Sequence, residues 1–250
     1  MSNFDLAFVL LAEAAPPNVE ALSSAIRAIG FPDARVLPPR AEDDGSTEVQ
    51  LGGDQRLLVM LMPAPHPDAA GMAGPLTPPA EELAAAPAHY VVTALGLEGQ
   101  VADKDRALAA LTAAVVRSSE ATAAMLGHGR LFYDAGIFVE VAEAAFEQSE
   151  VPVEVIVDVT AAREPDGRLS LLSHGLERYD RENFFVTVSA GGVDAVDFVL
   201  SLARWMIERP DVHLPTGDTV GRDAEEQIVV QRGPHPLDPA RTVVRLDLPG

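Results

Sequence analysis

Histidine imidazoles and carboxylates are the side chains of this sequence that could bind a metal ion and activate water. The chain has six histidines and 38 acidic residues. Nitrogen and oxygen ligands of this kind form catalytic zinc sites when their spacing places them on one surface. No two histidines are three or four residues apart, and no His-Glu-x-x-His string occurs. A metal site would have to be assembled by the fold, so no metal ligands are assigned from the sequence.

Two histidines lie near the ends of predicted strands. His66 belongs to the string Pro63-Ala64-Pro65-His66-Pro67, which follows an apolar strand, and His89 opens the strand predicted over 90–95. The two side chains could meet at the rim of one sheet. The favoured alternatives are that the prolines end the sheet and that His89 is an ordinary hydrogen-bonded residue at a strand end.

The segment Gly217-Asp218-Thr219-Val220-Gly221 is the best candidate for a binding site. It lies between an apolar helix that carries Trp205 and a Val-rich strand near 228–230. Two glycines around an Asp-Thr pair predict a tightly shaped turn. Asp218 and Thr219 could bind a cation or the backbone of a partner, whereas the favoured structural alternative is an Asx-turn made by Asp218.

Other sequences typical of catalysis do not occur. There is no cysteine, no Gly-x-Ser-x-Gly string and no Gly-x-x-x-x-Gly-Lys string. The single lysine, Lys104, lies in an Asp-Lys-Asp run at a predicted helix start, where it is poorly placed for Schiff-base or phosphate chemistry. We therefore expect no catalytic residue and no cofactor.

The charge of the chain favours one class of partner. The formal net charge is −20, and a field of that sign repels nucleic-acid phosphates and anionic membrane surfaces. The absence of cysteine fits a cytoplasmic protein, and no stretch has the length and apolarity of a membrane span. We expect a protein partner, possibly a basic one, and no nucleic-acid or membrane partner.

Hydrophobic periodicity predicts an α+β fold with mixed, mostly antiparallel sheets and helices packed on one face. The two halves could be similar α/β sandwiches. The chain is expected to be a single unit over 1–250, with possible sub-lobes 1–100 and 101–250 and a boundary near 98–103 or 148–150. Strands are predicted at 4–11, 35–37, 47–51, 57–62, 90–95, 151–159, 169–172, 184–188, 228–231 and 243–248, and 233–240 is predicted to be a loop. Helices are predicted at 18–29, 81–85, 104–125, 137–148 and 193–208, and the last should be buried on two sides.

Several strings resemble the bacterial domain-of-unknown-function 4261 family. They are Gly175-Leu176-Glu177, the Trp205 helix, the segment 217–221 and the closing strand at 243–248, preceded in the same order by strings at 62–67, 88–92 and 111–114. The resemblance covers nearly the whole chain. Family members often have Pro-Ile-Pro and Trp where this chain has Pro65-His66-Pro67-Asp68, so the His66 loop departs from the shared pattern. The resemblance implies a stand-alone bacterial cytoplasmic protein and implies no activity, substrate or cofactor.

These observations favour a non-catalytic protein that binds another protein, in a regulatory or immunity-like role. One alternative is a metal-assisted hydrolase built from His66, His89 and Asp218. Another is a small-ligand binder with a pocket between the halves. The candidate site residues are Gly217, Asp218, Thr219, Gly221, His89 and His66.

Overall fold

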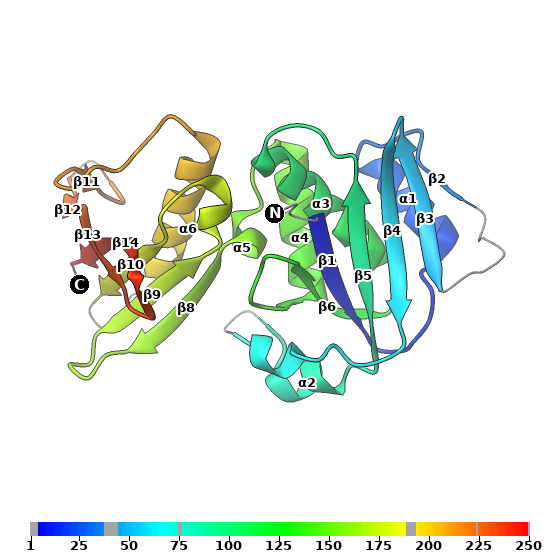
Figure 1. Ribbon diagram of the computed structural model, residues 1–250, viewed down its shortest axis with the longest axis horizontal. Helices are drawn as coiled ribbons and strands as arrows, with labels where there is room; N and C mark the ends of the chain where they lie inside the picture. Colours follow the sequence, from blue (N-terminus) through cyan, green and yellow to red (C-terminus); the bar gives the residue numbers. More distant parts are fainter. Residues whose placement is uncertain (1–4, 38–44, 75–76, 189–193, 224, 250) are drawn as a thin grey trace. The chain divides into compact units, whose positions relative to one another are not determined.

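The computed structural model describes residues 5–37, 45–74, 77–188, 194–223 and 225–249. Phe4 and Val193, the first residues of two predicted elements, lie outside the described residues. The chain divides into two compact units, Met1–Ile156 and Val157–Gly250 (Figure 1). Of the two boundaries expected, near 98–103 and near 148–150, the division lies closer to the second. The reason is that a strand formed after residue 100, Ala121–Leu126, pairs with the first strand of the chain, Asp5–Leu11.

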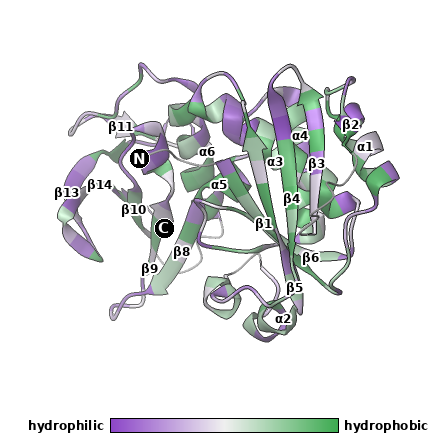
Figure 2. Ribbon diagram, turned by 45° about the vertical axis from the view of Figure 1, so that its right-hand side comes forward, coloured by the Kyte–Doolittle hydropathy of each residue, from purple (hydrophilic) through white to green (hydrophobic). Residues whose placement is uncertain are grey.

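The first unit is built on a seven-stranded sheet in the order β2-β3-β4-β5-β1-β6-β7. Its strands are β1 Asp5–Leu11, β2 Arg35–Val36, β3 Ser46–Gly52, β4 Gln55–Met62, β5 Ala88–Leu95, β6 Ala121–Leu126 and β7 Tyr133–Asp134. All neighbouring strands are antiparallel. Hydrophobic residues run along β1 and β5, the central strands (Figure 2). The strands predicted at 47–51 and 57–62 pair as β3 and β4, and a tight hairpin at Gly52-Gly53-Asp54 connects them.

Three helices cover one face of this sheet: α1 Val19–Ala28, α3 Val101–Arg117 and α4 Ala135–Gln148. Asn18 caps α1, because its side-chain oxygen accepts a hydrogen bond of 3.0 Å from the backbone N–H of Ala21. Asp134 caps α4 by accepting from the N–H groups of Gly136 and Ile137. The predicted starts of both helices are therefore confirmed to within two residues.

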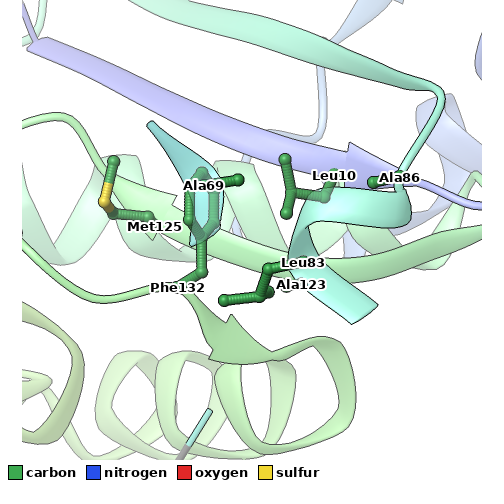
Figure 3. Packing of buried hydrophobic residues seen from close by; sticks show 7 residues of the cluster. All are labelled: Leu10, Ala69, Leu83, Ala86, Ala123, Met125 and Phe132. Carbon is green, nitrogen blue, oxygen red and sulfur yellow. The ribbon is translucent and has the colours of Figure 1, made fainter. Parts of the chain in front are cut away.

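A smaller hydrophobic cluster covers the opposite face. Phe8 and Leu10 alternate along β1 with Ala7 and Val9, so the two pairs point to different faces. Leu10 packs in the cluster with residues of the 3-10 helix η1 Ala69–Met72 and of α2 Ala80–Ala85 (Figure 3). The cluster contains Leu10, Ala69, Leu83, Ala86, Ala123, Met125 and Phe132.

The helix predicted over 104–125 is wrong in its second half. α3 ends at Arg117, and Thr122 and Met125 belong to β6. The hydroxyl groups of Ser118 and Ser119 donate to the carbonyl oxygen of Val115 and help to end the helix. The residues that follow then pair with the otherwise open edge of β1. Tertiary pairing has overridden the helical propensity of this Ala-rich stretch.

The strand predicted over 151–159 is also wrong. Val153–Ile156 forms a short helix, α5, and strand β8 begins only at Asp158. The alternation of valines suggested one buried face, but Val151, Pro152, Val153 and the 155–158 run are buried without alternation. The valines therefore pack on all sides of a compact connection.

The second unit is built on a five-stranded sheet in the order β13-β14-β10-β9-β8. Its elements are β8 Asp158–Arg163, β9 Leu169–His174, the 3-10 helix η2 Leu176–Tyr179, β10 Phe184–Val188, α6 Asp194–Glu208, β13 Gln231–His235 and β14 Asp238–Leu248. β10 and β14 are parallel, and the other neighbours are antiparallel. Two further strands, β11 Thr219–Val220 and β12 Ile228–Val229, form a separate antiparallel ribbon.

The loop predicted over 233–240 is instead part of a hairpin of β13 and β14. The turn is tight because the Nδ1 atom of His235 accepts hydrogen bonds from the backbone N–H groups of Leu237 and Asp238, each at 3.1 Å. His235 is buried, and its role in forming this turn has no local sequence pattern.

The fold class is α+β with mostly antiparallel sheets, as the sequence predicts. Among the described residues, helices are all too short or too polar to cross a membrane.

Candidate functional site

Helix α6 forms one wall of a groove in the second unit. Ala195, Val199, Ala203 and Met206 are buried along one side of the helix, which contacts β10. The other side, with side chains three or four residues apart, lines a cavity of about 770 Å³. The lining residues of α6 are Asp194, Asp197, Phe198, Ser201, Leu202 and Trp205.

The C-terminal end of α6 is held by a neighbouring turn. The guanidinium of Arg181 donates to the carbonyl oxygens of Met206, Arg209 and Pro210. The Arg181 guanidinium provides hydrogen-bond donors for carbonyl groups that lack partners inside the helix. Its positive charge also interacts favourably with the negative end of the helix dipole. The groove wall is thereby fixed at the end that carries Trp205.

The opposite wall of the groove is formed by the segment 217–221, the best candidate for a binding site in the sequence. The N–H of Gly217 donates to the carbonyl of Val230 at 2.9 Å, and the N–H of Val230 donates to the carbonyl of Asp218 at 2.8 Å. Thr219–Val220 continues this pairing as β11 against β12. Gly217 has φ +95°, a left-handed conformation that favours glycine. The predicted turn is therefore the entry to a short antiparallel ribbon.

Gly221 is required by a close approach of the chain to itself. A Cβ atom added there would clash with the carbonyl oxygen of Glu226 and lie 3.1 Å from that of Asp223. Arg222 closes the same loop by donating to the Glu226 carboxylate from its backbone N–H, at 2.7 Å, and from its guanidinium. These hydrogen bonds hold the pKa of Glu226 below its usual range.

Acidic side chains stand on both walls. Asp194 and Asp197 project from the first turn of α6, and Asp218 from the opposite wall, all three exposed. Among the described residues of the lining, one is an arginine, Arg222. Its pKa is raised, mainly by the hydrogen bond to Glu226 and to a smaller extent by Asp194, so its charge is already compensated within the loop. The groove is left with an excess of negative charge.

The floor of the groove is apolar. Phe198 is almost fully buried, whereas Leu202, Trp205 and Val220 keep part of their surface accessible. Trp205 is the only tryptophan of the chain. The guanidinium carbon of Arg209 lies 5.6 Å from the centroid of its ring, a cation–π contact made by a residue outside the lining set.

The candidate residues of the second unit have two different roles. Asp218, Thr219 and Gly221 line the groove, and Gly217 shapes the turn that leads to it. The Asx-turn is not formed, since the Asp218 carboxylate accepts no hydrogen bond from any described residue. Asp218 is an exposed residue of the groove lining, so a ligand could reach its carboxylate.

The two histidines of the first unit do come together. Their ring centroids lie 5.2 Å apart at an interplanar angle of 74°, and Nδ1 of His89 is 2.9 Å from the carbonyl oxygen of Ala64. His66 also makes edge contacts with Phe8 and Phe132, at centroid distances of 5.1 and 5.2 Å. Burial lowers the pKa of His66, the neighbouring His89 lowers it further, and Asp68 opposes both effects.

This pair is packed as aromatic rings and lacks a ligand set. Nδ1 of His66 accepts a hydrogen bond of 3.3 Å from the N–H of Asp68. Asp218, the third residue of the hydrolase alternative, belongs to the second unit. Over the described residues, no group of three or more His, Asp or Glu side chains is arranged to hold a metal ion.

Sequence reasoning missed Asp194, Asp197, His213 and Arg222, which also line the groove. The helix predicted over 193–208 was expected to be buried on two sides. Phe198, Leu202 and Trp205 form its second apolar stripe, but Leu202 and Trp205 are only half-buried. Asp194 and Asp197 precede this stripe at helical spacing. That combination, acids one turn before a half-apolar stripe, is the pattern that could have located the groove.

A second hollow, of about 480 Å³, lies against α3 and α4. Its charged lining includes Arg117 and Glu143, which form an ion pair with each other. Glu140 and Glu147 also line this hollow, and its apolar lining is aliphatic. The groove between α6 and β11 (the α6–β11 groove) is larger, at about 770 Å³, and its lining contains the aromatic side chains Phe198 and Trp205.

Comparison of the chain with protein-family models, with curated proteins and with solved structures finds no match.

Proposed function

We propose that this protein is a non-catalytic protein-binding protein, with a regulatory or immunity-like role in the bacterial cytoplasm, and that it binds its partner in the α6–β11 groove. The observation that carries the proposal is the combination of an apolar floor with carboxylates on both walls. Buried aromatic anchors supply most of the affinity in protein interfaces, and surrounding charges select the partner. The resemblance to the domain-of-unknown-function 4261 family agrees with a stand-alone bacterial protein.

The charge of the groove favours a basic partner. Asp194, Asp197 and Asp218 add a local negative field to a chain whose net charge is −20. Complementary charge speeds association and disfavours acidic competitors. A basic protein surface with exposed apolar side chains matches both features of the groove.

The chemistry of the groove supports binding over catalysis. Among the described lining residues, Ser201 and Thr219 carry hydroxyl groups and His213 carries an imidazole. A histidine activates a hydroxyl nucleophile when it lies within hydrogen-bond reach. Within the described residues, His213 makes no hydrogen bond to either hydroxyl, so no activated nucleophile is assembled.

The test compares partners captured from bacterial extracts by the full chain and by two double variants. Asp194→Asn with Asp197→Asn removes two groove carboxylates, and Glu81→Gln with Glu82→Gln makes the same charge change on exposed positions of α2. A partner captured through the groove is retained by the α2 variant and reduced about tenfold or more by the α6 variant. The purified partner should then change the fluorescence of Trp205.

Thermal unfolding accompanies this comparison, because each acid in the first turn of α6 also stabilises the helix by about 0.3–1 kcal/mol. Equal capture by both double variants, or a purified partner that leaves Trp205 unchanged, would overturn the proposal.

A small-ligand site is the second candidate, because the volume of about 770 Å³ lies within the range of ligand pockets. A small neutral metabolite that saturates the Trp205 response, with no basic protein captured, would favour this candidate.

A further inference from the structure

We infer that the part of the partner that enters the groove is an extended basic segment, which pairs through its main chain with the open edge of β11. The inference rests on the proposed function, and it specifies the conformation and the chemistry of the segment. Three features carry it: the open edge, the size of the cavity and the layout of its side chains.

The first feature is the direction of the peptide groups in β11. Asp218 is hydrogen-bonded to Val230 through the N–H of Val230, and the next pair in the ladder is Thr219 with Val229. Bonded and non-bonded pairs alternate in an antiparallel ladder. The N–H and C=O of Thr219 therefore point away from β12.

Over the described part of the chain, that edge is unpaired. The ribbon there consists of β11 and β12, and Thr219 is also part of the groove lining. No described residue makes a hydrogen bond with the peptide groups of Thr219. An unpaired strand edge inside a groove is the element to which extended peptides add as a further strand.

The second feature is the cavity volume. A strand residue in a packed sheet occupies about 160 Å³, from a rise of about 3.3 Å, a strand spacing of about 4.8 Å and a sheet spacing of about 10 Å. The cavity of about 770 Å³ thus holds about five extended residues. Five residues of helix, about 7.5 Å long and 10–12 Å wide, would fill a similar volume. The volume therefore sets the length of the segment, and the open edge of β11 favours its extended conformation.

The third feature is the separation of apolar and acidic side chains. Side chains of an extended segment alternate between two directions. One set meets the floor formed by Phe198, Leu202 and Trp205, and the other set meets the carboxylates of Asp197 and Asp218. The segment that fits has basic residues alternating with apolar ones.

The test uses the probe acetyl-Lys-Leu-Lys-Leu-Lys-amide and the full chain, with Trp205 fluorescence as the readout. Five further probes carry one N-methyl group each, at successive residues. N-methylation removes a single main-chain donor, so it should weaken binding about tenfold at alternate positions and little at the positions between them. The intervening probes are matched controls, since they carry the same modification.

A second measurement is independent of the peptide series. The amide of Thr219 should exchange rapidly with solvent in the free chain and become protected when the probe is bound. The acidic peptide acetyl-Glu-Leu-Glu-Leu-Glu-amide, with the same apolar residues, should give neither protection nor a fluorescence change.

The outcomes separate this inference from the proposed function. Alternating sensitivity with protection of Thr219 supports strand addition. Binding that is indifferent to N-methylation overturns strand addition and leaves the groove as a binding site. No binding of the probe at about 1 mM also overturns the inference, and the proposed function then stands or falls on the capture experiment alone.

Discussion

His66 illustrates how packing sets the response of a single residue to pH. The ring contacts Phe8, Phe132 and His89, and its environment favours the neutral form. The charged or titratable groups that act on it are His89, which disfavours its protonation, and Asp68, which favours it. The net effect is a pKa below the ordinary value of 6.5.

This lowered pKa predicts a loss of stability in mild acid. Above pH 6.5 His66 is neutral in both the folded and the unfolded chain, so its contribution is fully present. As the pH falls below 6.5 the unfolded chain binds the proton first, and the free energy of unfolding decreases until the pH reaches the folded pKa. Urea unfolding followed by circular dichroism at several pH values should show this decrease.

The variant His66→Phe keeps an aromatic ring and removes the titration. Its free energy of unfolding should depend less on pH than that of the native chain in this window. Parallel curves for the two proteins would contradict the explanation.

Gly221 illustrates a residue that is fixed by sterics. Gly221→Ala should destabilise the second unit by about 1–3 kcal/mol, because the methyl group would clash with the carbonyl oxygen of Glu226. Gly71→Ala is the matched control, since a Cβ atom at Gly71 would have no neighbour within 4 Å. Trp205 fluorescence during thermal unfolding reports the first variant, and circular dichroism reports both. Equal melting temperatures for the two variants would refute the steric role.

Among the elements, α1 has an end that could be predicted from the sequence. Asn18 follows two prolines, and its side chain accepts the N–H of Ala21. Asn18→Ala should therefore cost about 1 kcal/mol of stability, whereas Asn18→Asp should cost little, because aspartate caps helices equally well. Chemical unfolding of the two variants measures the difference, and the role of the cap is refuted if alanine and aspartate behave alike.

Local turn chemistry explains which elements the sequence predicts well. Glycine and proline punctuate the hairpins at 52–54 and 165–167, and both are formed. Such turns depend only on neighbouring residues, so a sequence pattern is sufficient to locate them.

The elements that were mispredicted depend on distant partners. Thr122 and Met125 continue a helical pattern, but β1 offers an edge that only the tertiary fold reveals. The 151–159 run alternates like a strand, but its surroundings bury both sets of side chains. A period in the sequence cannot show which surfaces will be covered.

Only one wall of the groove could be predicted from the sequence, because the other wall depends on which residues face each other in the fold. The segment from Gly217 to Gly221 carries turn chemistry, so its position was found. Asp194 and Asp197 could not be distinguished among 38 acidic residues without knowing what faces them. The open edge of β11 follows from pairing with β12 and has no local sequence pattern.

For the whole molecule, the dominant property is its charge of −20. Binding of acetyl-Lys-Leu-Lys-Leu-Lys-amide should therefore weaken about tenfold when salt rises from about 0.05 M to about 0.5 M, because screening shortens the range of the carboxylates. The α6 variant with Asp194→Asn and Asp197→Asn should show a smaller salt dependence than the native chain. Trp205 titrations at several salt concentrations measure both, and equal slopes would exclude these two residues as the source.

The acidic rim of the groove (Asp194, Asp197 and Asp218) tolerates substitution more readily than the two glycines that shape its backbone, Gly217 and Gly221. Each rim carboxylate is an exposed side chain, so a substitution from aspartate to asparagine changes the charge of the groove at a cost of at most about 1 kcal/mol in helix stability. Gly217 and Gly221 have no such freedom, because one needs a left-handed conformation and the other has no room for a methyl group. Under the proposed function, related proteins with different partners should therefore differ at the acidic positions and keep both glycines.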